Sequence, residues 1–122
     1  MKITALDGKE HEFKFGIGFV RAIDKVYTVE KEGFKFGVGL DLTLTKLISR
    51  DPVTLAEYLY NARKDSTLTR EAIENLLDSL PNKEYETLYD AVIDEISKAN
   101  ATASKYKAVK ANLQAAQKKN KK

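Results

Sequence analysis

Few residues of this chain could do acid–base or metal chemistry. His11 is the only histidine, there is no cysteine, and Glu10 and Glu12 flank the histidine. Neighbouring residues of a strand point to opposite faces, so these three side chains are not expected to share a metal ion, and we predict a solvated His11. Asp90 and Asp94 share a helix face, as many exposed acidic pairs do. Because common nucleophile–base pairs are mostly excluded, we expect no enzymatic activity, no metal and no cofactor.

A repeated glycine pattern is the second candidate for chemistry. FKFGIG begins at Phe13, and FKFGVG begins at Phe34. A dinucleotide-binding loop would have a third glycine three positions further on, where this chain has Arg21 and Leu42. Glycine also suits a sharp change from strand to helix. We therefore interpret both segments as strand-to-helix junctions, and the sequence does not decide which of their phenylalanines are exposed.

Charge divides the chain into an acidic part and a basic part. Residues 99–122 hold seven lysines and no acid, whereas residues 1–98 hold 14 lysines and arginines against 18 acids. A lysine cluster favours salt-sensitive binding to nucleic acid. However, the basic segment has one aromatic residue, Tyr106, and no arginine, so base stacking and base readout are poorly supplied. A small nucleic-acid-binding protein that acts through this tail is the alternative function.

The basic segment also carries an apolar stripe. Tyr106, Val109, Leu113 and Ala116 follow the spacing of a helix that lies along another helix. The stripe spans fewer than two heptads, so it is not expected to be stable alone. The segment is either a solvated, partly disordered tail or a helix that becomes ordered on a partner. We take the four residues as candidate residues for partner binding or self-association.

Periodicity along residues 1–98 predicts the elements that position these residues. Alternation predicts a β-hairpin over 2–15 that turns at Asp7-Gly8. A helix is predicted over 17–27, followed by an extended segment over 28–36 that turns near Glu32-Gly33. The remaining predicted elements are helices that follow Gly37, Asp51-Pro52, Thr69 and Asn82, with Asp51, Thr69 and Asn82 as N-caps.

These elements predict an α+β fold that is mainly α. A small N-terminal antiparallel hairpin or sheet should pack on about five helices in one globular domain over 1–98, and 99–122 should form a basic helical or disordered tail. No stretch approaches the ~20 apolar residues of a membrane span, and the N-terminus lacks the apolar core of a signal peptide. We expect a soluble intracellular protein without a membrane partner.

Several blocks in order resemble a known family. KEHEFKFGIGFVRAIDKVY, GFKFGVGL and DPVTLAEYLYNAR precede an acidic amphipathic helix, and together they are similar to the tail assembly chaperones of long-tailed, siphovirus-type phages of Gram-positive bacteria. The resemblance covers about residues 3–98. It implies a non-enzymatic protein that associates with the tape measure protein and keeps it soluble while the tail tube polymerises. It also implies self-association, a location in the host cell cytoplasm and absence from the mature virion.

The resemblance further implies a second product of the same gene. Many members of the family are also made in a longer form by programmed ribosomal frameshifting. The segment QKKNKK at 117–122 must be encoded by A-rich codons, because all lysine and asparagine codons begin with AA. We hypothesise that a frameshifted longer form of the chain is a partner, and the nucleotide sequence would test this. The family carries over no catalytic residues.

Overall fold

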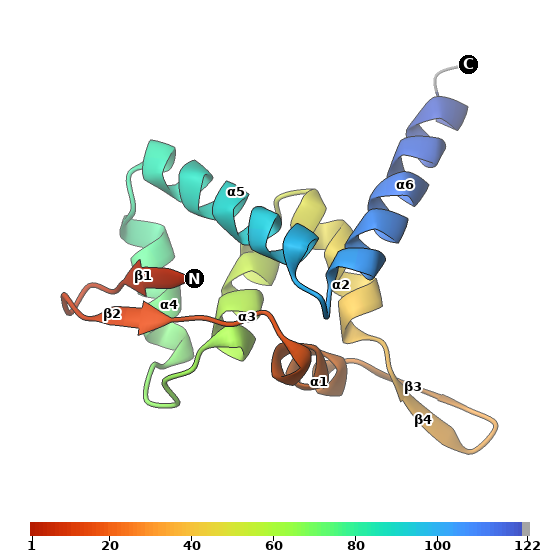
Figure 1. The fold of residues 1–122 in the computed structure, drawn as a ribbon, viewed down its shortest axis with the longest axis horizontal. Helices are drawn as coiled ribbons and strands as arrows, with labels where there is room; N and C mark the ends of the chain where they lie inside the picture. Colours follow the sequence, from red (N-terminus) through yellow and green to blue (C-terminus); the bar gives the residue numbers. More distant parts are fainter. Residues whose placement is uncertain (121–122) are drawn as a thin grey trace.

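Six helices and two antiparallel hairpins build the described part of the chain (Figure 1). The computed structural model describes residues 1–120, except for the side chains of Phe36 and residues 118–120. The fold is α+β and mainly α, as predicted. The elements in chain order are β1 (Lys2–Thr4), β2 (Glu10–Glu12), α1 (Ile17–Val26), β3 (Thr28–Lys31), β4 (Phe34–Gly37), α2 (Gly39–Ile48), α3 (Pro52–Ala62), α4 (Arg70–Ser79), α5 (Asn82–Lys98) and α6 (Ala103–Asn120).

The two hairpins form separate sheets at opposite ends of the molecule (Figure 1). In the first hairpin Ile3 pairs with His11. The second hairpin turns through Glu32 and Gly33, whose φ angles of 54° and 80° match the left-handed conformation that a two-residue turn requires. Both turns lie where the sequence predicts them, and the helix between the hairpins does as well.

Two of the three predicted helix caps are confirmed. Asp51 accepts a hydrogen bond from the Thr54 amide at 3.3 Å, and Thr69 accepts one from the Ala72 amide at 3.1 Å. The prediction for Asn82 is wrong, because α5 begins with this residue and has no side-chain cap. The residue before it is Pro81, whose extended backbone (φ −55°, ψ 144°) already supplies the non-helical conformation of an N-cap.

The end of α2 is held against α5 by an arginine. Arg50 has a φ of 67°, the left-handed conformation that often ends a helix, and its amide donates to the Leu47 carbonyl at 3.0 Å. Its guanidinium lies 4.4 Å from the centroid of the Tyr89 ring and forms ion pairs with Glu86 and Asp90. The Tyr89 hydroxyl in turn donates to the Leu47 carbonyl at 2.6 Å, so helix end and core are joined at one place.

The hydrophobic core lies around α3. Its fully buried residues come mainly from α1, α2, α3 and α5, and Phe13 and Phe15 add two buried rings from the segment before α1. The Phe15, Phe19 and Tyr58 rings meet edge to face, with centroids 5.1 and 5.0 Å apart. Thr43 Oγ1 donates to the Gly39 carbonyl at 2.6 Å, so the Tyr58 hydroxyl donates to Thr43 Oγ1 at 2.7 Å, which satisfies this buried polar group.

The two glycine pairs have different neighbours, although both stand at strand-to-helix junctions. A Cβ atom on Gly39 would lie 1.9 Å from the Ile23 carbonyl oxygen, and one on Gly37 would lie 2.7 Å from Asp24 Cβ. A Cβ atom on Gly18 would meet nothing within 4 Å. The second pair therefore lets α1 and the start of α2 approach closely, and the first pair has no such requirement. Neither pair needs a bound phosphate to explain it.

Candidate partner-binding surfaces

Helix α6 contains most of the basic segment and leaves the body at one end (Figure 1). Its start is anchored by Thr102, which is fully buried and donates through Oγ1 to the Ile96 carbonyl at 2.6 Å. One turn later, Lys105 Nζ pairs with the Asp41 carboxylate at 2.7 Å. These contacts place the first turns of α6 against α2 and α5. The described part of the basic segment is thus mainly a helix whose first turns are packed against the body of the protein.

The four residues of the predicted stripe are divided between the body and the surface. Tyr106 and Val109 are half-buried and pack against the hydrophobic core. Leu113 is also half-buried but is not among the residues that pack against this core, and Ala116 is exposed. The helix thus places the four on one side, but its own body takes up the first two. Their role in binding a partner stays a prediction, and the half of the stripe beyond Val109 offers the free surface.

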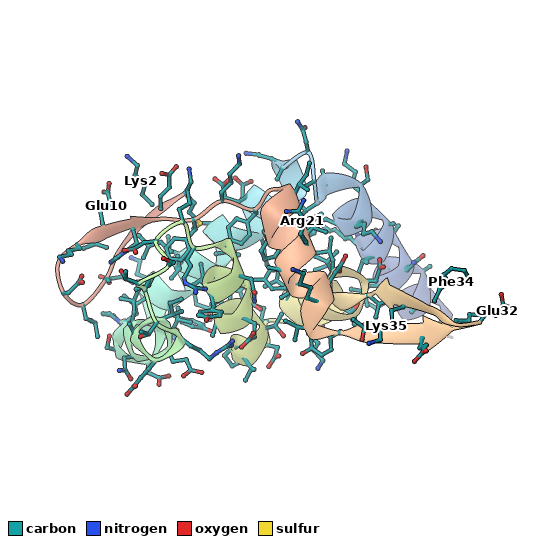
Figure 2. All side chains as sticks on the ribbon, turned by 90° about the horizontal axis from the view of Figure 1, so that it is seen from below. Lys2, Glu10, Arg21, Glu32, Phe34 and Lys35 are labelled. Atoms are coloured by element: carbon teal, nitrogen blue, oxygen red, sulfur yellow. The ribbon has the colours of Figure 1, made fainter. Side chains whose placement is uncertain are left out.

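The β3–β4 hairpin is the second candidate surface. It projects from the body, and its main contact with the body is between β4 and α1 (Figure 1). All four residues of β3 are exposed. Phe34, at the start of β4, is 67% exposed, and Figure 2 shows it near the tip of the hairpin. This is a large aromatic side chain for which the described chain provides no cover.

Exposed apolar side chains gather at and next to this hairpin. Val26 and Tyr27 end α1 and lead into β3, Val29 lies within β3, and Phe34 begins β4, and all four are exposed. Lone exposed apolar residues are normal, whereas a concentration of them usually marks an interaction surface. The sequence named Phe34 as a candidate exposed aromatic residue but did not decide between it and the others. In the structure, Phe13 and Phe15 are buried and Phe34 is exposed.

A groove of about 960 Å³ lies beside the start of α1. Its lining includes residues 12–19, 61–64 and 99–101, together with Met1 and Glu95. Charges of both signs are present, from Glu12, Lys14, Arg63, Lys64 and Glu95. This mixture favours neither an anion nor a cation, so the groove does not by itself indicate a ligand.

His11 is buried, and the prediction that it is solvated is wrong. Only 8% of its surface is exposed, whereas Glu10 and Glu12 are exposed. His11 shares the lining of a small pocket with Leu59 of α3 and with Ala72, Ile73 and Leu76 of α4, which the local sequence does not reveal. His11 Nδ1 lies 3.4 Å from Asp65 Oδ2, and Thr67 lowers the pKa of the Asp65 carboxyl by hydrogen bonding to it. The flanking glutamates point away, as alternation along the strand predicts.

Other kinds of site find little support among residues 1–120. Within that range, no three His, Cys, Asp or Glu side chains lie close enough together to hold a metal ion. No helix there is long and apolar enough to cross a membrane. The segment 117–122, on which the frameshifting hypothesis depends, ends with Lys121 and Lys122, which lie outside the described residues.

Comparison with known families gives one finding. A family model described as "Phage tail assembly chaperone protein, TAC" matches residues 4–110. The match runs from the end of β1 through β2, the β3–β4 hairpin and α1 to α5 into the first turns of α6. Comparison with curated proteins and with solved structures gave no match.

Proposed function

The chain belongs to the phage tail assembly chaperone family, and from this we infer that it binds the tape measure protein and keeps it soluble while the tail tube assembles. The family match over residues 4–110 is the observation that carries this proposal. A chaperone of this kind acts by covering apolar surface on its client and needs no bond-making chemistry. We accordingly propose that the protein is not an enzyme and uses no cofactor.

Surface features of the molecule support this function. A protein that shields apolar segments of a client needs exposed apolar side chains of its own, held on a stable body. The hairpin β3–β4 and the outer half of the α6 stripe supply such side chains. We propose that Leu113 and Ala116, with Tyr106 and Val109 at the base, contribute to contacts with the client or with further copies of the chain.

Co-expression tests the proposed client. The tape measure gene of the same phage genome is expressed with and without this chain, and the soluble fraction of the tape measure protein is measured by centrifugation and quantitative blotting. We expect most of the tape measure protein to be soluble only in the presence of the chain. A soluble fraction that is equal in both cultures would refute the proposal.

Nucleic-acid binding through the lysines of α6 is the second candidate. Lys107 and Lys110 are exposed on α6, and residues 99–122 carry seven lysines in total. A salt titration separates the two functions. Affinity for a nucleic acid should fall steeply between about 50 and 200 mM salt, because counterions are released on binding. Binding to an apolar client should change much less over the same range.

We also propose where and in what form the protein works. It acts in the host cell cytoplasm during tail assembly, associates with itself, and is absent from the finished virion. Mass spectrometry of purified virions tests the last statement, because a stoichiometric signal from this chain would contradict it. Sequencing of the gene and its downstream overlap tests whether a frameshifted longer form exists.

A further inference from the structure

We propose that one face of the β3–β4 hairpin is the client-docking surface, and that it takes the apolar stripe of an amphipathic helix. This inference rests on the proposed function, because it assigns a place to the client contact that the chaperone role requires. The docking face is defined here as Tyr27, Val29 and Phe34, with Lys31 at its edge. It lies at the end of the molecule opposite the N-terminal hairpin (Figure 2).

Register places these residues on a common side of the hairpin. Lys31 pairs with Phe34 across the two strands, and cross-strand partners share a face. Val29 lies two residues before Lys31 in β3 and so is on the same face. Tyr27 belongs to the same face by alternation, and its carbonyl accepts a hydrogen bond from the Val38 amide at 2.9 Å, which extends the ladder. The opposite face carries Thr28, Glu30 and Lys35. The hairpin therefore has one apolar face and one polar face.

This apolar face lacks the packing that such a face usually has. An antiparallel sheet commonly packs its apolar face on the core and leaves its polar face in water. Here Val29 and Phe34 are 48% and 67% exposed, and the hairpin meets the body mainly where β4 contacts α1. A two-stranded hairpin in water is marginally stable on its own. A partner that covers the docking face would bury these side chains and stabilise the hairpin.

The edges of the hairpin favour a helix over an added strand as the occupant. Charged side chains line both strands, with Glu30 and Lys31 in β3 and Lys35 in β4. Charges on an edge strand oppose pairing with a further strand. A helix instead presents a row of apolar side chains to the face of a sheet and leaves the edges free. The chemistry of the occupant is therefore an apolar helical stripe with polar flanks.

The size of the docking face argues against a second copy of the chain. Two strands of four residues span about 13 Å by about 10 Å, whereas each partner of a stable complex buries roughly 800 Å². Two such faces stacked on each other would not hold a dimer. A contact of this size is weak when single and becomes effective when many copies bind along one long client. It is also readily reversed, as a chaperone that must leave its client requires.

Paired substitutions test the docking face. The variant Val29→Thr/Phe34→Thr removes its apolar groups and keeps residues that favour strands. The control Leu6→Thr/Val53→Thr removes two other exposed apolar side chains. They are 63% and 68% exposed and lie outside the β3–β4 hairpin. Each tagged variant is co-expressed with the tape measure protein of the same phage genome, and the amount of tape measure protein retained per tagged chain is measured. Circular dichroism checks that each variant is folded. The single variant Phe34→Thr, which changes the hairpin less, is tested in the same way.

We expect about tenfold less tape measure protein on the hairpin variant and no change on the control. Equal retention by the wild type and the hairpin variant would overturn the docking face and leave the proposed function intact. A wild type that retains none would refute the proposed function, and the docking face with it. A hairpin variant that changes only the oligomeric state would assign this face to self-association and overturn the proposal.

Discussion

At the scale of single residues, the sequence predicts types of position better than it predicts neighbours. The two glycine pairs are read correctly as strand-to-helix junctions, but only the structure shows that Gly37 and Gly39 touch α1, whereas Gly18, which lies within α1, has open space beside it. The burial of His11 is missed for the same reason, because residues of α3 and α4, which follow much later in the chain, line the same pocket as this side chain. Alternation along a strand predicts which side chains share a face, but it does not predict which of the two faces the rest of the protein covers.

The close approach at Gly39 predicts that alanine substitution lowers the free energy of unfolding at Gly39 and raises it at Gly18. Gly39→Ala places a methyl group against the Ile23 carbonyl, so we expect the free energy of unfolding to fall by about 3 kcal/mol or more. The added methyl group of Gly18→Ala has free space beside α1, so we expect the free energy of unfolding to rise by up to about 1 kcal/mol. Urea denaturation measures both values. Equal effects of the two substitutions would contradict the assigned contact.

Because two tyrosines are buried, we predict that the protein loses stability at high pH. Burial raises the pKa of Tyr58 and of Tyr89 well above the ordinary value of 10.0. The folded state therefore holds these protons more tightly than the unfolded chain, so their contribution is complete below about pH 10 and declines as the pH rises further. Each group steepens that decline by up to about 1.4 kcal/mol per pH unit.

The check is urea denaturation at pH 9 and pH 11. We expect Tyr58→Phe/Tyr89→Phe to be less stable than the wild type at pH 9, because two buried hydrogen bonds are lost. The gap should narrow at pH 11. Tyr27→Phe, which removes an exposed hydroxyl, is the control and should follow the wild type. Parallel curves for the double variant and the wild type would contradict this prediction.

At the scale of elements, local signals predict most of the secondary structure. The Asp51-Pro52 pair and Thr69 begin helices where expected, and the second hairpin turns through the predicted Glu32-Gly33 pair. The first hairpin has a longer loop, in which the Gly8 amide donates to the Ala5 carbonyl and Gly8 has the positive φ angle. The error at Asn82 is a shift of one residue, because Pro81 can end one helix and start the next. The sequence does not indicate that the second hairpin stands apart from the first, since strand pairing depends on which segments meet in space.

Cap residues of α3 and α5 give a matched prediction. Asp51→Ala removes the acceptor for the Thr54 amide, and we expect the free energy of unfolding to fall by about 1 kcal/mol. Asn82→Ala changes the first helical residue of α5, whose side chain caps nothing. This substitution should change the free energy of unfolding by less than about 0.5 kcal/mol. Thermal unfolding monitored by circular dichroism compares the two. A larger loss for Asn82→Ala would mean that its side chain caps α5 after all.

At the scale of the whole molecule, composition predicts the two parts and packing decides how they meet. The change to Ala and Lys after residue 98 marks the basic segment, and the stripe predicts its helical side. The pattern did not indicate that Tyr106 and Val109 face the chain's own core, because a stripe looks the same whether its partner is internal or external. A division of the chain at residue 98 stays a prediction, and the contacts of α6 suggest a division nearer residue 110.

Truncation at two positions tests this division. Removal of residues 111–122 takes away side chains that over 111–117 are exposed or half-buried, and we expect little change in the midpoint of thermal unfolding. Removal of residues 103–122 also deletes Tyr106 and Val109 and uncovers parts of α2 and α5, so the midpoint should fall by several degrees. If both truncated chains unfold at the wild-type temperature, α6 is a tail throughout and the division belongs at residue 98.

The lysines of the second hairpin offer a built-in reporter of occupancy. Lys31 and Lys35 lie on either side of its turn, in a segment held mainly by its own ladder and by α1. Such a segment opens locally more often than the core does, so brief trypsin treatment of the free protein should cut early at these two bonds. A bound client would slow that cut while leaving digestion at Lys9, which is exposed in the loop between β1 and β2, as an internal reference. Peptide mapping of one digest would then reveal what fraction of the copies is engaged, without a label and without a mutation.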